Sequence, residues 1–489
     1  MLSNVLVANR GEIAIRVIRA CKEMGINATA IYSDADRNSL HVKFANNSIC
    51  IGGREPRESY LDIEKIMEAA RKCDADAIHP GYGFLAENTE FVERCEKEGY
   101  IFVGPNSKTI KMAGDKLIAR RSMLNLGINI VPGSLELIET KEDVIEIGKE
   151  VGYPIMIKAS CGGGGRGIRV IKNKEEVEHG LNTARSEALA SFGSPDLYVE
   201  KYLEGGRHIE FQIIADNYKN TVHLGERECS IQRRHQKLLE EAPSPLLDES
   251  TRKRIGDYAV RGAKAVGYRS AGTFEFLYHK NDFYFLEINT RIQVEHPVTE
   301  MVTGIDIIKE QFKIAANEKL DLKQDEINLR GHSIECRINA EDPESFHPCL
   351  GTIERYHAPS GGGIRIESCV YAGMRITQYY DTLLSKLISW GRNRDEAIAR
   401  LRNALDEYII DGTKTTISFH KRILANEDFI KGNISVDFIK NMGNIGFEEE
   451  REVAAVVAAH YLNSQKIEIK KLGNKNWKFA KREFRKRWK

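Results

Sequence analysis

The most constraining feature of the chain is a pair of segments rich in aromatic and apolar residues, 273–278 and 283–288. The polar residues 280–282 lie between them, and this pattern is typical of a β-hairpin with a short turn. A three-residue turn would place His279 opposite Phe283. The sequence therefore predicts two antiparallel strands whose side chains alternate between the faces of a sheet.

Counting along the hairpin from that turn places Glu275 opposite Glu287, with Asn289 on the same face. Two carboxylates facing each other across a strand pair repel, whereas a divalent cation between them would reverse the sign of that interaction. Such oxygen ligands suit a hard cation, Mg²⁺ or Mn²⁺, which commonly bridges substrate phosphates. Alternating polar residues follow at 291–295, so we predict a metal–nucleotide site with an adjoining pocket for a second substrate.

Size and composition favour a multidomain protein without nucleic-acid or membrane functions. At 489 residues the chain is too long for one core, and about two to four domains are expected. A net charge of +1 gives no support to nucleic-acid binding. No apolar run reaches membrane-spanning length, and no signal peptide precedes the first strand pattern. Nine scattered cysteines without a C-x-x-C pair predict reduced thiols in a cytoplasmic protein.

Residues 1–110 alternate predicted strands and helices, which indicates a parallel, doubly wound sheet. The predicted strands are 5–8, 28–32, 77–78 and 101–103, and the predicted helices are 12–24, 60–71 and 90–98. The first turn, residues 9–12, lacks the G-x-G-x-x-G pattern, so NAD binding is not expected. That turn and residues 79–84 follow strands at an edge where ligands collect, although simple glycine turns would explain both segments equally well.

The composition along the chain suggests four parts. We expect an N-terminal domain (1–113), a second domain (114–330) with a glycine-flap subdomain at about 131–203, an α+β domain (331–446) and a tail (447–489). The tail is acidic, then alanine-rich, then basic. Most charge runs are simply solvated, and a docking role is the alternative.

A glycine-rich loop at 162–165 lies between two predicted strands, 154–157 and 168–171. This context differs from a P-loop, which is followed by a helix. Backbone N–H groups of glycines can still approach phosphates closely, and Lys116 and Lys158 would add positive charge. The loop is therefore predicted to cover phosphates, with a merely flexible turn as the alternative.

Three further segments carry weaker signals. Residues 198–203 look like a strand edge able to recognise adenine through its backbone. Residues 232–237 are dense in cations and donors, as a surface stripe or an anion site would be. Arg337 shares a strand face with Glu335, and spacing alone assigns it no role.

Taken in order, these segments resemble the ATP-grasp enzymes, and specifically biotin carboxylase, over about residues 1–446. The motifs that carry the resemblance are Asn9-Arg10-Gly11-Glu12, residues 79–84, the glycine flap, residues 232–243, residues 287–300 and residues 335–341. The resemblance implies ATP contacts from Lys116, Lys158, Gly164, Gly165, Glu200, Lys201, Tyr202, Leu203, His208 and His235. It implies metal ligation by Glu275, Glu287 and Asn289.

The resemblance also implies the roles of the remaining site residues. Bicarbonate would be held by Lys237, Arg291, Gln293 and Val294, with Glu295 as the base that deprotonates it, Arg337 stabilising a biotin enolate and Tyr82 near the biotin ring. The implied reaction forms carboxyphosphate and ADP from bicarbonate and ATP, and then carboxylates biotin. Cys161 departs from the family pattern by interrupting a longer glycine run, and we expect activity to survive this change.

The chain contains no Met-Lys-Met biotin acceptor, so biotin is expected on a partner polypeptide. The tail resembles that of the ATP-hydrolysing subunit of two-subunit pyruvate carboxylases, which favours pyruvate over an acyl-CoA such as acetyl-CoA or propionyl-CoA as final acceptor. The expected partner is a biotin-bearing carboxyltransferase subunit, in a homodimer or hetero-oligomer. Another ATP-grasp ligase, or a nucleotide-binding regulatory protein without turnover, remains the alternative.

Overall fold

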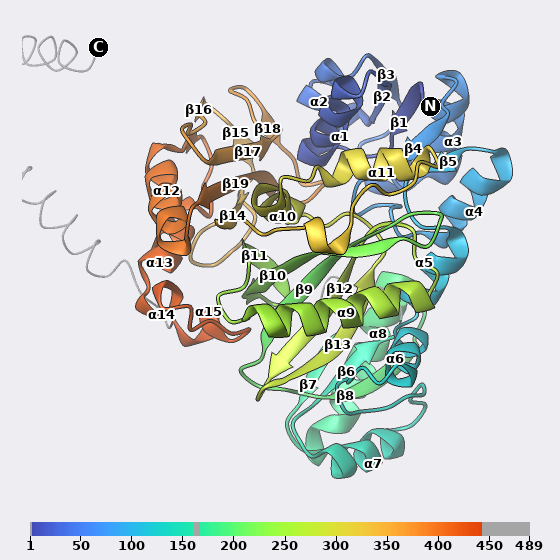
Figure 1. Ribbon diagram of the computed structural model, residues 1–489, viewed down its shortest axis with the longest axis vertical. Helices are drawn as coiled ribbons and strands as arrows, with labels where there is room; N and C mark the ends of the chain where they lie inside the picture. Colours follow the sequence, from blue (N-terminus) through green and yellow to red (C-terminus); the bar gives the residue numbers. More distant parts are fainter. Residues whose placement is uncertain (1, 161–166, 443–489) are drawn as a thin grey trace, which may run out of the picture. The chain divides into compact units, whose positions relative to one another are not determined.

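The N-terminal part of the chain is built around a parallel sheet with the strand order β3-β2-β1-β4-β5 (Figure 1). Its strands are β1 (Asn4–Val7), β2 (Asn27–Tyr32), β3 (Asn47–Cys50), β4 (Ala77–His79) and β5 (Ile101–Phe102). Its helices are α1 (Gly11–Glu23), α2 (Leu40–Phe44), α3 (Ile63–Lys72) and α4 (Thr89–Glu98). The predicted doubly wound sheet is confirmed. β3 was not predicted, because this short strand is largely exposed and lacks an apolar pattern.

The computed structural model of this chain describes residues 2–160 and 167–442. Residues Met1–Phe438 group into one compact unit. The central glycines of the predicted flap, including Gly164 and Gly165, Cys161 and the predicted tail at 447–489 lie outside the described residues.

Two strands frame the predicted flap, as expected from the sequence. A three-stranded antiparallel sheet has the order β7-β6-β8, which leaves β8 at an edge. The elements of this region are α5 (Ser107–Gly114), α6 (Lys116–Asn125), α7 (Lys141–Val151), β6 (Ile155–Ala159), β7 (Ile168–Ile171), α8 (Val177–Phe192) and β8 (Leu197–Lys201). Buried aliphatic side chains of β6 and β8 form its core, together with residues of α7 and α8.

The largest sheet has eight strands in the order β13-β12-β9-β10-β11-β14-β19-β17, and every pair in it is antiparallel. The strands are β9 (Arg207–Ala215), β10 (Thr221–Arg233), β11 (Gln236–Ala242), β12 (Ser270–His279), β13 (Asp282–Asn289), β14 (His332–Asn339), β17 (Ile364–Ser368) and β19 (Leu383–Gly391). Because β11 pairs with β14, the sheet runs without a break across the domain boundary expected near residue 330. Side chains from both sides of that boundary therefore share one surface.

Helices cover this sheet, and small elements complete the C-terminal part of the described chain. Helices packed near the sheet include α9 (Glu249–Ala265), α10 (His296–Thr303), α11 (Ile307–Ala315) and α12 (Arg394–Glu407). The small elements are β15 (Gly351–Thr352), β16 (Arg355–His357), β18 (Arg375–Ile376), β20 (Ile409–Asp411), α13 (Ile417–Ala425), α14 (Glu427–Ile430) and α15 (Phe438–Asn441). Within the described residues, no helix is both long and apolar enough to span a bilayer.

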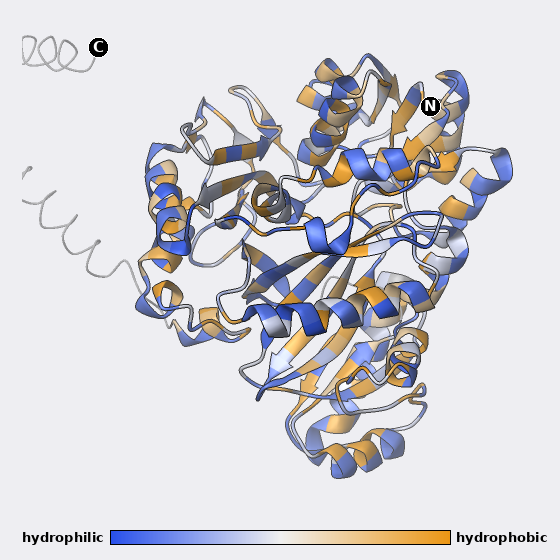
Figure 2. Ribbon diagram, in the orientation of Figure 1, coloured by the Kyte–Doolittle hydropathy of each residue, from blue (hydrophilic) through white to orange (hydrophobic). Residues whose placement is uncertain are grey.

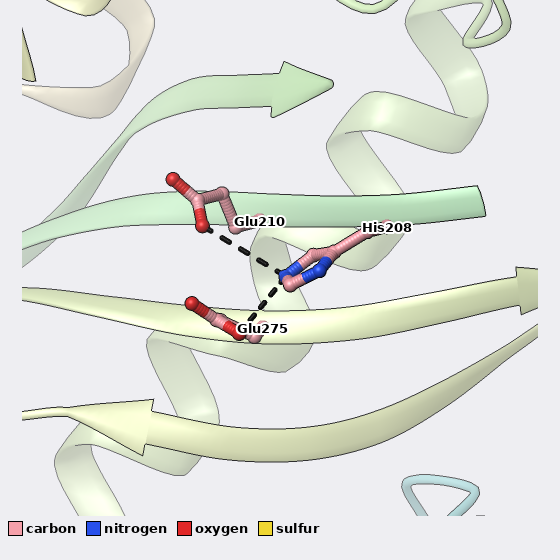
Figure 3. Close-up of side chains that lie close together, drawn as sticks. All are labelled: His208, Glu210 and Glu275. Carbon is pink, nitrogen blue, oxygen red and sulfur yellow. Dashed lines mark ion pairs between the residues drawn. The ribbon is translucent and has the colours of Figure 1, made fainter. Parts of the chain in front are cut away.

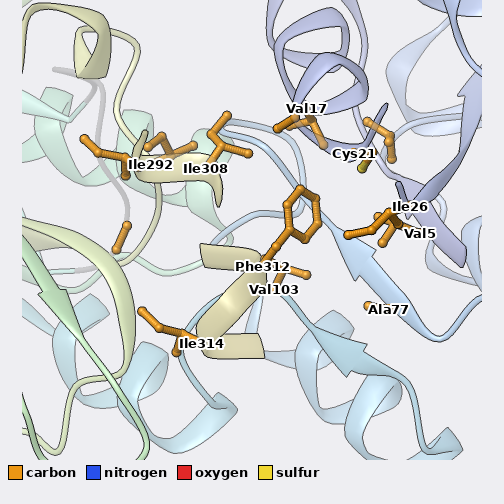
Figure 4. Close-up of a cluster of buried hydrophobic side chains, with 14 of the residues drawn as sticks. Val5, Val17, Cys21, Ile26, Ala77, Val103, Ile292, Ile308, Phe312 and Ile314 are labelled. Atoms are coloured by element: carbon orange, nitrogen blue, oxygen red, sulfur yellow. The ribbon is translucent and has the colours of Figure 1, made fainter. Parts of the chain in front are cut away.

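A hydrophobic core joins the N-terminal sheet to the rest of the unit (Figure 4). Val5 of β1 and Val17 of α1 belong to the same buried cluster as Phe312 of α11 and Ile292, which lies between β13 and α10. The helices that cover sheets carry both hydrophobic and hydrophilic residues, as Figure 2 shows for α9. Burial of Ile292 fixes the segment that contains the neighbouring polar residues 291, 293 and 295.

The hairpin of β12 and β13 confirms one prediction and corrects another. Its turn has two residues, Lys280 and Asn281, both with positive φ, so His279 pairs with Asp282. The expected three-residue turn was therefore wrong. The ladder shifts by one residue between Phe276 and Glu275, which leaves one extra residue on β13. This bulge restores the predicted pairing, and Glu275 does lie opposite residue 287.

Candidate active site

Lys237 is the centre of a cluster of buried charges. It lies on β11, and its Nζ atom is 2.5 Å from Glu210 Oε2, 2.9 Å from Glu275 Oε1 and 2.7 Å from Glu295 Oε1. Burial disfavours the charged form of Lys237, but the three carboxylates outweigh it and raise its pKa well above the ordinary value. One ammonium group thus connects side chains of β9, β12 and the segment before α10.

Glu295 has a second cationic partner on its other oxygen. Its Oε2 atom accepts a hydrogen bond of 2.8 Å from Nη2 of Arg337, which lies on β14. Burial of Glu295 opposes ionisation, but Lys237 and Arg337 hold its pKa well below the ordinary value. The carboxylate is therefore ionised at neutral pH and is able to accept a proton. The structure thus brings together three of the four predicted catalytic residues.

Arg291, the fourth of them, is held by partners on several sides. Its Nε donates to Glu87 Oε2 (2.8 Å), its Nη1 to Gln293 Oε1 (3.0 Å) and its Nη2 to Asn289 Oδ1 (3.2 Å). Gln293 in turn donates through Nε2 to Glu275 Oε1 (3.4 Å). The predicted anion-binding residues Arg291 and Gln293 are therefore in contact with each other and with two predicted metal ligands.

The predicted metal ligands lie on both strands of the hairpin. Asn289 donates through Nδ2 to Glu275 Oε1 at 2.8 Å. Glu287, opposite Glu275, has Lys116 Nζ at 3.1 Å from its Oε2. Glu275 Oε2 has His208 Nε2 at 2.9 Å. Each carboxylate that was predicted to bind a cation therefore faces a cationic or hydrogen-bonding side chain of the protein.

His208, Glu210 and Glu275 form a compact group on β9 and β12 (Figure 3). Glu210 pairs directly with Glu275 across these strands, and His208 Nε2 is 4.0 Å from Glu210 Oε2. Burial opposes the ionisation of Glu275, but Lys237 and His208 hold its pKa well below the ordinary value. Glu210 was not predicted as a site residue, although the sequence shows a polar–apolar alternation at 208–212.

Several residues predicted to contact the nucleotide lie on β6 and β8. Lys158 of β6 donates through Nζ to Glu200 Oε2 at 2.8 Å, and Arg120 also pairs with Glu200. Burial raises the pKa of Glu200, but Lys158 and Arg120 outweigh it, and the net shift is downward. Lys201 Nζ donates to the backbone carbonyl oxygens of Gly152 (2.9 Å) and Tyr153 (3.0 Å).

Three further predicted residues lie at connections between elements. Tyr202 and Leu203 follow β8, and the backbone N–H of Tyr202 donates to the carbonyl oxygen of Pro154 at 3.1 Å. His235 lies in the two-residue connection between β10 and β11, where it has a φ of 63°. Burial lowers the pKa of His235, and the nearby Lys158 and His208, both predicted nucleotide contacts, lower it further.

Tyr82 and Val294 meet a buried lysine that the sequence analysis did not single out. Lys386 Nζ donates to the carbonyl oxygen of Val294 at 2.8 Å and lies 3.2 Å from Glu12 Oε1. The hydroxyl of Tyr82 donates to the same oxygen of Glu12. Lys386 lies opposite Arg337 in the β14–β19 ladder, which places Tyr82 on the Arg337 side of the site.

Several residues that shape the site were assigned no function in the sequence analysis. These are Glu87, Glu210, Glu240, Glu335 and Lys386. Glu240 and Glu335 belong to segments that carried the family resemblance, yet spacing alone did not connect them. Their proximity depends on the β11–β14 ladder, which joins residues almost a hundred positions apart.

Family models match most of the chain in an unbroken order. The biotin carboxylase N-terminal domain matches residues 1–110, the carbamoyl-phosphate synthase L chain ATP binding domain matches residues 115–323, and the biotin carboxylase C-terminal domain matches residues 335–441. This order agrees with the three structural regions described above.

Relatives match over almost their whole length. The chain is 51% identical over 449 residues to biotin carboxylase 1 of Bacillus subtilis, covering 91% of this chain and 100% of the relative. It is 48% identical over 476 residues to a pyruvate carboxylase subunit of Methanothermobacter thermautotrophicus, covering 96% of this chain and 97% of the relative.

The solved structures that resemble this fold include one with ligands. The biotin carboxylase domain dimer of Hydrogenobacter thermophilus 2-oxoglutarate carboxylase, in complex with MgADP, ADP and bicarbonate, superposes with a TM-score of 0.89 at 50% identity and covers 91% of this chain and 98% of that chain. Sequence motifs, charge cluster and relatives agree, and the chain belongs to the biotin carboxylase family of ATP-dependent, ATP-grasp ligases.

Proposed function

We propose that this protein uses ATP, Mg²⁺ and bicarbonate to carboxylate biotin carried on a partner polypeptide, and that the final acceptor is pyruvate. The observation that carries the proposal is the position of Glu295, whose two oxygens meet Lys237 at 2.7 Å and Arg337 at 2.8 Å. An ionised carboxylate between two cations is suited to removing a proton from an anionic substrate that the same cations attract.

The low pKa of Glu295 makes it a weak base, so the substrate must also be acidified. Lys237 and Arg291 would do this by stabilising the dianion left when bicarbonate loses its proton to Glu295. Attack of that dianion on the γ-phosphate of ATP gives carboxyphosphate and ADP, in a reaction governed by positioning and charge stabilisation. Carboxyphosphate then breaks down to CO₂ and phosphate beside biotin, on the side where Arg337 and Tyr82 lie. The phosphate takes the proton of the ureido nitrogen of biotin, and that nitrogen attacks CO₂ to form carboxybiotin.

The residues of the hairpin fit a divalent cation. Glu275 and Glu287 face each other, and Asn289 adds an amide oxygen, which is the all-oxygen set that Mg²⁺ or Mn²⁺ prefers. The cation would neutralise phosphate charge there. The side chain of Lys116 places positive charge beside Glu287, and His208 adds positive charge beside Glu275 when it is protonated, which supports a site that balances these carboxylates.

The preference for pyruvate has support from the extent of the matches. The match to the pyruvate carboxylase subunit covers 96% of this chain, against 91% for biotin carboxylase 1. A match over 96% of the chain must extend into the C-terminal region at 447–489, whose composition suggested the same kind of protein. The biotin carboxylase subunit of an acetyl-CoA or propionyl-CoA carboxylase is the second candidate, and a 2-oxoglutarate carboxylase appears among the structural neighbours.

The identity of the final carboxyl acceptor must be tested with the partner polypeptide present, rather than with the isolated chain. Affinity capture with this chain, followed by streptavidin detection, should recover a biotin-bearing polypeptide, and the pair should form oxaloacetate from pyruvate. Assays of the same pair with 2-oxoglutarate, acetyl-CoA and propionyl-CoA provide the comparison. Carboxylation of one of these in place of pyruvate would contradict the preference while leaving the biotin carboxylase activity intact.

The first half of the reaction is tested on this chain alone. Purified protein with Mg²⁺ should hydrolyse ATP in a bicarbonate-dependent reaction that free biotin stimulates. A nucleotide-binding protein without turnover would bind MgADP and show no such hydrolysis. Light scattering would test whether the chain forms the proposed homodimer, since the neighbour in complex with bicarbonate is a dimer.

A further inference from the structure

Two buried carboxyl groups face each other beside Arg337. Glu240 of β11 lies directly opposite Glu335 of β14 in the antiparallel ladder, so their side chains project from the same face. Both residues are completely buried. Like charges placed opposite each other on strands repel, and burial strengthens the repulsion by lowering the dielectric constant.

The cations around this pair compensate only one negative charge. Nη2 of Arg337 lies 2.6 Å from Glu240 Oε1 and 2.8 Å from Glu295 Oε2, so it serves Glu240 and the proposed base together. Neither Glu335 nor Glu240 accepts a hydrogen bond of good geometry from a described residue, and of the two only Glu240 has an ion-pair partner there. Lys386 is near, but its Nζ is engaged by Glu12 and by the carbonyl oxygen of residue 294.

An uncompensated buried carboxylate is so unfavourable that the group binds a proton instead. Burial raises the pKa of Glu335 well above its ordinary value. Burial also raises the pKa of Glu240, although Arg337 opposes this shift. Because Arg337 forms an ion pair with Glu240 and no ion pair joins Glu335 to a described residue, the proton resides on Glu335 and Glu240 stays ionised beside it.

We propose that Glu240 and Glu335 hold a single proton between them and act as positioning residues for Arg337. Protonated Glu335 lets Glu240 remain ionised next to it, and ionised Glu240 holds the guanidinium that also contacts Glu295. The part of the proposal that concerns catalysis rests on the proposed function of Arg337, whereas the shared proton does not depend on it.

The pH dependence follows from the groups that face the pair. Glu240 is faced by Arg337, Glu295 and Lys237, and Glu335 by Lys386, Glu240, Arg337 and Glu295. When the pH falls, Glu240 takes up a second proton and Arg337 loses one of its two carboxylate partners. When the pH rises far enough to remove the proton from Glu335, two adjacent charges compete for the same guanidinium. Biotin carboxylation should therefore decline on both sides of an optimum.

Infrared spectroscopy tests the shared proton without any assay of activity. Near neutral pH, the wild-type protein should show the carbonyl band of a buried protonated carboxylic acid, and Glu335→Gln should remove it. The variant Glu226→Gln is a matched control, because Glu226 is also buried but is compensated by Arg252 at 2.7 Å. If Glu335→Gln removes no more of this band than the control does, the proposal is overturned.

Stability gives a second measurement that is independent of the reaction. A carboxyl group whose folded pKa is raised takes up a proton on folding, so it lowers stability progressively as the pH rises from the unfolded pKa to the folded pKa. Replacing Glu335 with Gln removes that dependence. The melting temperature of Glu335→Gln relative to the wild type should therefore increase with pH, and a constant difference would contradict a raised pKa.

Kinetics test the effect on Arg337. Glu240→Gln should lower kcat for carboxylation of free biotin by about ten-fold or more, with the KM for ATP within about two-fold of the wild type. It should also remove the fall in carboxylation rate at low pH that is caused by protonation of Glu240. Glu335→Gln should instead remove the fall in rate at high pH that is caused by ionisation of Glu335. The control Glu226→Gln should lower the melting temperature and leave the pH profile unchanged. A Glu240→Gln variant that behaves like this control would overturn the positioning role, even if the infrared result stands.

Discussion

At the scale of single residues, the site shows how a few cations hold an excess of buried acids. Lys237 alone contacts three carboxylates, and Arg337 contacts two. Breaking a buried ion pair costs more than the pair itself contributes, because the remaining charge stays desolvated. Each acid in the cluster therefore affects the charge state of its neighbours, and substitutions must be judged by which partner they leave unpaired.

The proposed base gives the first prediction. Glu295→Gln should keep the shape of the side chain but cannot accept a proton, so bicarbonate-dependent ATP hydrolysis should fall by about 100-fold or more. Binding of MgADP should change little, because Glu295 is not among the predicted nucleotide contacts. Steady-state ADP release and calorimetric titration with MgADP measure the two effects. Turnover close to that of the wild type would remove Glu295 from the role of base.

At the scale of elements, the hairpin of β12 and β13 depends on a bulge that sequence alone did not show. The two-residue turn by itself would pair Glu275 with Leu286, and the extra residue moves Glu287 into that position. A shift of one residue moves every side chain to the opposite face of a strand. The metal-binding face therefore depends on one inserted position as well as on its acidic residues.

Insertion of one alanine between Leu286 and Glu287 tests this directly. With the turn and the bulge kept, the insertion would move Glu287 opposite Phe274, so Glu287 and Asn289 would point away from Glu275 and affinity for MgADP should fall by about ten-fold or more. Deletion of Leu286 is the matched control, because it removes the bulge but leaves Glu287 directly opposite Glu275, and it should retain most of the affinity. Calorimetry measures binding, and circular dichroism checks that both variants keep their strand content. Equal affinity in the two variants would show that the register has no such function.

The β11–β14 ladder also carries a structural ion pair on its other face. Glu241 is 2.6 Å from His332 Nε2 and 2.7 Å from Arg394 Nε, at the start of α12. Burial of Glu241 opposes ionisation, but His332 and Arg394 outweigh it and lower its pKa to about 2. A lowered folded pKa stabilises the protein above the unfolded pKa, and this contribution is lost as the pH falls through the folded value.

Glu241→Gln should accordingly destabilise the protein by about 3 kcal/mol at neutral pH. The difference from the wild type should shrink as the pH falls from about 4.5 toward 2, because the wild-type carboxylate is protonated there as well. Denaturant unfolding at a series of pH values measures this trend. A difference that stays constant over that range would contradict the ion-pair explanation.

At the scale of the whole unit, the N-terminal part contributes a charge to the central site. Glu87 lies between β4 and α4, and its carboxylate accepts hydrogen bonds from the backbone N–H of Thr290 and from Arg291 Nε, both at 2.8 Å. The shared core around Ile292 supports the same segment. The orientation of Arg291 therefore depends on parts of the chain about two hundred residues apart.

Glu87→Gln should weaken the hold on Arg291 and raise the KM for bicarbonate by about five-fold, a modest effect because the pair is partly exposed. The KM for ATP should remain nearly unchanged. Glu98→Gln, which removes a partly exposed acid paired with Arg71 on the same N-terminal part, is the matched control. Initial-rate measurements at varied bicarbonate distinguish the two variants, and equal KM values for them would contradict this link.

The sequence by itself determined the local elements and the types of ligand. Apolar alternation and glycine positions predicted the strands and helices of the parallel sheet and the strands around the flap, because each of these elements depends on residues close together in the chain. The predicted pairing of Glu275 with Glu287 was correct only because a bulge offset the wrong turn length. The metal–nucleotide site was predicted from the acidic hairpin and the glycine loop, whereas the bicarbonate and biotin roles were implied by the resemblance to biotin carboxylase. The role of each site residue stays a prediction until it is tested by substitution.

Only the tertiary structure decided how these pieces meet. The contacts of Lys237 with Glu210 and of Arg337 with Glu240, and the pairing of Glu240 with Glu335, depend on the order and register of strands distant in sequence. Such registers are set by the packing of whole faces and by bulges, which no local pattern contains. The two-residue turn that was predicted as three shows the same limit, because a compensating bulge left the predicted acid pair in place.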